Sequence, residues 1–338
     1  MSLRRSAPAG VLLALGASFL VSCSRNPPQV VVYTSVDQVF SEPVFRAFDA
    51  ASGIRVRAVF DTEETKSTGV LNRLIAESAN PQADVFWSGD PVRPFLLIKR
   101  GLVEPYLSPQ AQGLPDGLRA PDGSWTGVAA RARVLLVNRK LLPEDRWPRS
   151  IRDLADPRWK GKGAIANPLF GTTTMHVAAL FTLWGEPAAR AFLDALRANE
   201  VRIASSNGEV KRLVVAGEVA FGLTDTDDAN EAGRQGADVG VVFPDADTMG
   251  TLVMPTAVVL MARAPHADAG RKLVDYLLSR EAEQRMAESA AHMPLRAGVA
   301  TPSGMRRVTE IRAMEVDYAR VAQEIERIQP WLRQWAGL

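Results

Sequence analysis

Carboxylates and hydroxyls that follow short apolar segments are the residues of this sequence best suited to chemistry. Three apolar segments, Val30–Ser35, Ile54–Phe60 and Ala83–Trp87, are typical of buried strands. Ligands bind beyond the carboxyl ends of strands in open parallel sheets, so the residues at these ends are candidates for a binding site. They offer hydroxyls, carboxylates and one amine: Ser35, Asp37, Lys66, Ser88 and Asp90.

A similar arrangement occurs further along the chain. Gly171–Thr174 follows an apolar segment and opens a helix. The free backbone N–H groups of such a helix start, with the hydroxyls of Thr172 and Thr173, suit an anion. Three aspartates follow the apolar segment Val219–Thr224: Asp225, Asp227 and Asp228.

The neighbouring charges of Asp227 and Asp228 repel each other unless a cation or a hydrogen-bond donor lies between them. We therefore expect Asp37, Asp227 and Asp228 to contact a cationic centre, which is a metal ion or an amine. The alternative is that the aspartates and threonines only cap the helices that follow them. That interpretation is favoured for any one residue, but the two sets together predict a ligand cleft between two α/β units.

Composition excludes several classes of function. The 338 residues include 40 Lys and Arg against 38 Asp and Glu, and the surplus lies in Arg4 and Arg5 near the start. The rest is neutral, so no nucleic-acid partner is expected. The single cysteine excludes an intrachain disulfide and a cysteine-based metal cluster. Hydrolase, zinc-protease and P-loop motifs are absent from the sequence, so we expect no catalysis.

The N-terminal segment is typical of a secretory signal. Basic residues precede the apolar stretch Ala9–Val21, which is shorter than the roughly 20 residues of a membrane-spanning helix. The stretch ends in LVSC, which resembles the bacterial lipobox. We expect a signal peptide over residues 1–22, a lipid on Cys23 and a tether over 23–29. The alternative is a plain signal peptide with an incidental cysteine.

Strand and helix patterns alternate along the rest of the chain, which predicts an α/β fold with parallel sheets. Near the C-terminus, apolar residues recur every seven positions, at Ile311, Tyr318, Ile325 and Leu332. This spacing predicts an amphipathic helix, kinked or broken near Pro330 and packed on its own domain.

Several motifs together carry a family resemblance from about Val30 to Arg296. They are VVYTSVDQ, PQADVFWSGD, DLADPRWKGKGAIANP, GEVAFGLTDTDDA and MPTAVVLMARAPHADAGRKLVDYLLS. With them the chain resembles the class II periplasmic solute-binding proteins, in the extracellular family that includes the ferric-ion-binding proteins of ABC importers. The resemblance implies a two-lobed, hinged type II periplasmic-binding-protein fold with a central ligand cleft.

The resemblance also implies how the chain is divided and what it binds to. The first lobe would hold residues 30–126 and 258–305, and the second 127–257 and 306–338. The protein would be a monomeric, lipid-anchored lipoprotein on the extracytoplasmic side of the membrane, periplasmic if the cell is Gram-negative. It would deliver its ligand to ABC permease subunits. No cofactor is expected, apart from a metal ion bound as ligand.

The departures from the family pattern concern the ligand. Ferric-binding members have a histidine or similar ligand after the first strand, a glutamate after the third and a tyrosine pair, where this chain has Asp37, Gly89 and Asp227-Asp228. The anion pocket matches at Gly171–Thr174. Carboxylates opposite an anion pocket suit a zwitterion, such as an aminophosphonate or amino acid, or a metal ion bound with an anion. The rival functions are a carboxylate-metal hydrolase and a ligand-sensing lipoprotein for a signalling partner.

Overall fold

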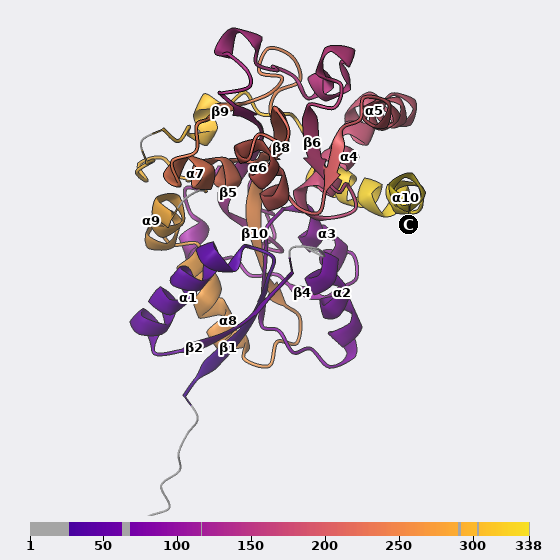
Figure 1. Ribbon diagram of the computed structural model, residues 1–338. Coiled ribbons are helices and arrows are strands. Elements are labelled where there is room, and N and C mark those ends of the chain that lie inside the picture. Colours follow the sequence, from indigo (N-terminus) through magenta and orange to yellow (C-terminus); the bar gives the residue numbers. More distant parts are fainter. Residues whose placement is uncertain (1–26, 63–67, 116, 290–291, 303, 338) are drawn as a thin grey trace, which may run out of the picture.

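Two long strands, β5 (Thr126–Asn138) and β10 (Val253–Met261), run antiparallel through the middle of the molecule and connect its two lobes (Figure 1). The computed structural model describes residues 27–62, 68–115, 117–289, 292–302 and 304–337. The predicted signal peptide, the predicted lipid site at Cys23 and the candidate ligand Lys66 lie outside these ranges.

The first lobe is built on parallel strands, as the alternating pattern predicts. Strand β1 pairs in parallel with β2 on one side and with β3 on the other, and β3 pairs antiparallel with β10. The elements of this lobe are β1 (Gln29–Thr34), α1 (Gln38–Ser52), β2 (Arg55–Phe60), α2 (Thr68–Ala76), β3 (Val85–Ser88), α3 (Val92–Ile98), β4 (Val103–Glu104), α8 (Ala267–Leu277) and α9 (Arg280–Ser289).

The second lobe repeats this architecture around the other half of β5. Strand β6 pairs in parallel with β7 and β8, while β8 and β9 pair antiparallel with β5. Its elements are β6 (Gly163–Ala166), α4 (Gly171–Trp184), α5 (Glu186–Ala198), β7 (Arg202–Ala204), α6 (Asn207–Val215), β8 (Phe221–Asp225), α7 (Thr226–Arg234) and β9 (Val239–Val242). All ten strands belong to one continuous sheet.

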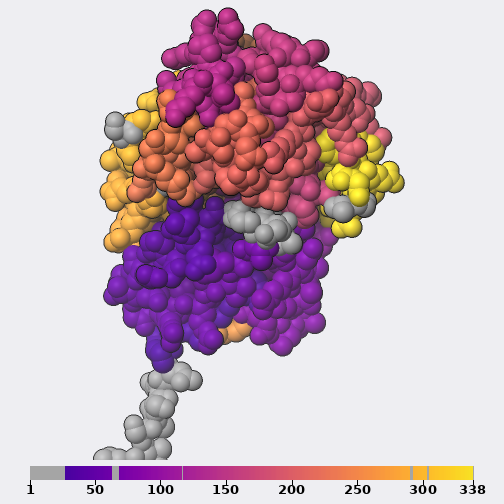
Figure 2. Space-filling model, viewed as in Figure 1, coloured from indigo at the N-terminus to yellow at the C-terminus, as the bar shows by residue number. Residues whose placement is uncertain are grey.

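Two hydrophobic cores cover the two faces of this sheet. Neighbouring strand residues enter different cores, Val32 in one and Tyr33 in the other, because side chains alternate along a strand. Each core draws residues from both lobes. The space-filling view shows the indigo first lobe against the magenta and orange second lobe (Figure 2).

The C-terminal helix, α10 (Tyr318–Ala336), packs against α4 of the second lobe and α3 of the first. Its burial confirms that it packs on its own protein. The predicted break near Pro330 is wrong, since the helix runs through this residue, which is exposed to solvent. The helix also begins later than the heptad pattern predicts: Ile311 is buried in an irregular segment before it. Within the described part of the chain, no helix combines the length and apolarity of a membrane span.

Candidate functional site

A polar pocket lies between the two lobes, at the carboxyl ends of strands from both. Ser35 and Asp37 come from the first lobe, Arg131 comes from β5, and the second lobe supplies most of the wall. The pocket brings together eight of the predicted site residues: Ser35, Asp37, Gly171, Thr172, Thr173, Asp225, Asp227 and Asp228. The remaining lining residues are Ala166, Asn167, Phe170, Ser205, Ser206, Asn207 and Gly208.

The start of α4 forms one wall of this pocket. Phe170 precedes the helix and provides no side-chain cap, and Gly171 opens it with a φ of +57°. The first N–H groups of a helix have no partner within the helix, so an uncapped start attracts anions. The start of α6 lies on the same pocket, where the Ser206 hydroxyl accepts a hydrogen bond from the Glu209 N–H at 3.1 Å.

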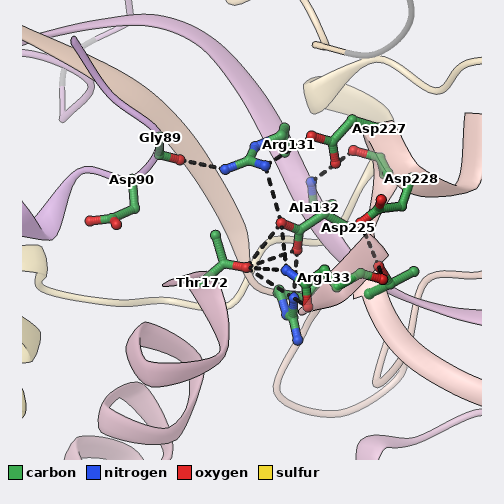
Figure 3. A network of polar contacts seen from close by, with 12 residues as sticks. Gly89, Asp90, Arg131, Ala132, Arg133, Thr172, Asp225, Asp227 and Asp228 are labelled. Carbon is green, nitrogen blue, oxygen red and sulfur yellow. Dashed lines mark hydrogen bonds and ion pairs between the residues drawn. The ribbon is translucent and has the colours of Figure 1, made fainter. Parts of the chain in front are cut away.

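Two arginines of β5, which the sequence analysis did not single out, hold the aspartates of this site (Figure 3). Arg133 is fully buried and donates to Asp225 at 2.7 Å, and to the hydroxyls of Thr172 at 3.0 Å and Thr173 at 3.2 Å. Arg131 lies 2.9 Å from Asp227 and 3.2 Å from Asp225. Thr172 and Thr173, which were expected to bind an anion, therefore belong to the same hydrogen-bond network as the aspartates.

Arg131 also ties the second lobe to the first. Its other terminal nitrogen donates to the Gly89 carbonyl at 2.5 Å, and the Gly89 N–H donates to the Ser35 hydroxyl at 2.9 Å. Burial disfavours the charge of this guanidinium, but Asp227 and Asp225 outweigh burial and raise the pKa of Arg131. Arg131 is therefore a permanent cation within the pocket wall.

Asp228 has a different environment from its neighbours. The Thr224 hydroxyl donates to its carboxylate at 2.7 Å, and the Lys211 amine lies 3.7 Å away, itself shared with Glu231. Burial, followed by the charge of Asp227, raises the pKa of Asp228 to about 7. A cationic ligand group beside Asp228 would favour its charged form.

Two predicted residues lie outside the pocket lining. Ser88 is buried, and its hydroxyl accepts from the Asp90 N–H at 3.3 Å. The Asp90 carboxylate accepts from the N–H groups of Val92 and Arg93 and pairs with the Arg93 guanidinium at 3.3 Å. The helix-capping interpretation therefore describes Asp90 better than the ligand-binding one.

The described residues contain no group of three or more His, Cys, Asp or Glu side chains arranged to hold a metal ion. Asp227, one of the three aspartates expected to contact a cationic centre, pairs with the Arg131 guanidinium. The four tyrosines, Tyr33, Tyr106, Tyr276 and Tyr318, are not among the pocket-lining residues. The neutralised aspartates and the open helix start together suit a ligand that carries an anion.

A signal for the missed arginines is present in the sequence. Arg131 and Arg133 interrupt an otherwise apolar run, and their spacing of two places both side chains on one face of a strand. A buried arginine needs an acid or several acceptors. If residues 126–138 are interpreted as a buried strand, the sequence therefore predicts buried acidic partners for both arginines.

The chain has the fold of the type II periplasmic binding proteins. Residues 80–321 match the family described as bacterial extracellular solute-binding protein, and the chain belongs to that family. Solved structures share its fold at low identity. Iron-bound HitA of Pseudomonas aeruginosa superposes with a TM-score of 0.82 at 22% identity, over 90% of this chain and 99% of HitA. AfuA of Actinobacillus pleuropneumoniae, with fructose-6-phosphate, has a TM-score of 0.81 at 22% identity, over 92% and 99%.

The names of three curated relatives refer to two kinds of ligand. A Salmonella typhimurium protein with the provisional name 2-aminoethylphosphonate-binding periplasmic protein is 29% identical over 96% of this chain and 92% of its own. Iron uptake protein A1 of Synechocystis is 28% identical over 85% and 84%. The major ferric iron-binding protein of Neisseria meningitidis serogroup B is 24% identical over 92% and 94%.

Proposed function

We propose that this protein is an extracytoplasmic solute-binding protein that delivers a small zwitterion, of the aminophosphonate type, to an ABC importer and performs no catalysis. Lipidation of Cys23 would hold it at the membrane, and the permease subunits would receive the ligand. Closure of the two lobes about β5 and β10 would enclose the solute. We place the boundaries between the two lobes near residues 126 and 258.

The observation that carries the proposal is the pairing of two features in one pocket. The uncapped start of α4 and the α6 start offer N–H groups to a phosphonate, and Thr172 and Thr173 lie beside them. Asp37 and Asp228 line the same pocket and suit an ammonium group. The Salmonella relative, whose name refers to 2-aminoethylphosphonate, supports this ligand class.

Ferric ion is the second candidate, because several relatives are named for iron. The residues that line the pocket include no tyrosine, so they do not support iron binding by phenolates. Ferric ion carried with an anion such as citrate needs no phenolate ligand, so both ligands belong in the test.

The experiment is titration calorimetry with three probes on residues 24–338, which lack the predicted signal peptide and the predicted lipid site at Cys23. We expect 2-aminoethylphosphonate to bind, and ethylphosphonate, which lacks the amine, to bind at least about tenfold more weakly, because a lost charged contact typically costs more than 1.4 kcal/mol. Ferric citrate should not compete. Binding of ferric citrate without any binding of the aminophosphonate would overturn the zwitterion proposal.

A further inference from the structure

The cleft already contains a cation of its own, the guanidinium of Arg131. One terminal nitrogen lies 2.9 Å from an Asp227 oxygen and 3.2 Å from an Asp225 oxygen. The other lies 2.5 Å from the Gly89 carbonyl. Figure 3 shows Arg131 between Gly89 on one side and the aspartates on the other. A single cation at this place would contact oxygens from both lobes.

Two guanidinium groups and two aspartates pair at this residue. Arg131 pairs with Asp225 and Asp227, and Arg133 pairs with Asp225. Arg133 is also directed to the threonines of α4, whereas Arg131 donates to Asp227. Loss of the Arg131 charge would remove a positive charge from beside both aspartates, at a place where Arg131 is only 9% exposed and charges interact strongly.

Gly89 packs closely on Ser35 and on the guanidinium. A Cβ atom at this position would lie 3.0 Å from the Ser35 carbonyl oxygen, which is tighter than ordinary contacts, and 3.4 Å from the Arg131 nitrogen, which is an ordinary van der Waals contact. The absence of a side chain at position 89 therefore lets its backbone lie against both residues.

We propose that Arg131 is a specificity-determining residue: its guanidinium fills the space between Gly89, Asp225 and Asp227 in which a metal ion would contact the same oxygens, and it thereby restricts the cleft to ligands that bring their own anion. This inference deepens the proposed function, on which it rests for the identity of the cleft. It predicts that the wild-type aspartates are closed to metal ions, and that loss of the Arg131 charge opens them.

The test is terbium(III) binding, followed by luminescence and calorimetry, on wild type and a set of variants. Arg131→Gln keeps an amide donor for Gly89 but removes the charge, and it should bind terbium at least about tenfold more tightly than wild type. Arg131→Lys, which keeps the charge, should resemble wild type. Arg93→Gln is the matched control, since Arg93 is also buried and paired with an aspartate but lies outside the pocket.

The double variant Arg131→Gln/Asp227→Asn should lose the gained terbium site, which locates the ion at Asp227. Equal terbium affinity in wild type and Arg131→Gln would overturn the inference, as would an equal gain in Arg93→Gln. Circular dichroism and melting curves show whether each variant is folded. If Arg131→Gln does not fold, the wild-type protein is used instead. A wild-type terbium signal that Asp227→Asn abolishes contradicts the inference. The absence of such a signal supports the inference.

These outcomes are separate from those of the proposed function. Failure of wild type to bind 2-aminoethylphosphonate would overturn the zwitterion proposal and leave the terbium result unaffected. Binding of the zwitterion with no terbium gain in folded Arg131→Gln would overturn the role of Arg131 alone.

Discussion

Asp90 and Asp227 each follow a buried strand and each pair with a buried arginine, yet only Asp227 lines the cleft. The partners of Asp90 lie within three residues, on the first turn of α3. The arginine that holds Asp227 lies 96 residues away, on a strand that both lobes share. A carboxylate satisfied by its own helix stabilises that helix start. A carboxylate satisfied from a distant strand joins separate parts of the fold into a site.

The largest effect should come from the residue on which both cleft arginines converge. Asp225→Ala removes a carboxylate partner from Arg133 and from Arg131, and both arginines are buried. Loss of one partner of a buried ion pair costs about 3–5 kcal/mol, and we expect the free energy of unfolding to fall by at least that amount. Urea denaturation measures it. A loss of about 1 kcal/mol or less, the level of an exposed pair, would show that the network does not hold the lobe.

The strand ends and the aspartates of this cleft were predictable from the sequence. The pattern of residues 126–138 also indicates two buried arginines, but it does not indicate which aspartates they face. Short apolar segments followed by Ser, Thr or Asp locate the ends of β1 and β8, because both features depend on local sequence. The role of an aspartate depends on what faces it. Arg131 and Arg133 face Asp225 and Asp227 only through the antiparallel pairing of β5 with β8, which is a tertiary contact.

The C-terminal helix shows the same limit. The heptad positions Ile311 and Met314 are buried, as an apolar pattern predicts, but they lie in an irregular segment that pairs with Thr251. A heptad pattern reports which side chains are buried, and not the backbone conformation that buries them. The helix begins only at Tyr318, where the Asp317 carboxylate accepts hydrogen bonds from the N–H groups of Ala319 and Arg320.

A smaller effect, restricted to stability, is expected at the local pair. Asp90→Asn keeps the shape and most of the capping at α3 but weakens the contact with Arg93, so the free energy of unfolding should fall by about 2 kcal/mol. Affinity for 2-aminoethylphosphonate should stay within about twofold of wild type, since Asp90 does not line the pocket. Denaturation and calorimetry on the same preparation check both values. A tenfold loss of affinity would place Asp90 in the binding site after all.

The smallest effect concerns pH and Asp228, which contacts the Thr224 hydroxyl and the Lys211 amine. Burial and the charges of Asp227 and Asp225 raise the pKa of Asp228 to about 7, while Thr224 and Lys211 act in the opposite direction. Below that pH the carboxyl is mostly neutral and contacts an ammonium group weakly. Without ligand, the raised pKa of Asp228 contributes to the free energy of unfolding. This contribution is fully present below pH 3.8, the ordinary pKa, and is lost as the pH rises through about 7.

Binding should therefore weaken as the pH falls. With a pKa of about 7, only about one tenth of Asp228 is charged at pH 6, so affinity for the amine should fall about tenfold, or about 1.4 kcal/mol, between pH 8 and pH 6. A phosphonate also takes up a proton near this range, so Asp228→Asn supplies the baseline. We expect that variant to bind weakly at every pH and to show only the baseline slope. Identical slopes in the two proteins would mean that Asp228 does not contact the ammonium group, and the cation side of the cleft would then rest on Asp37.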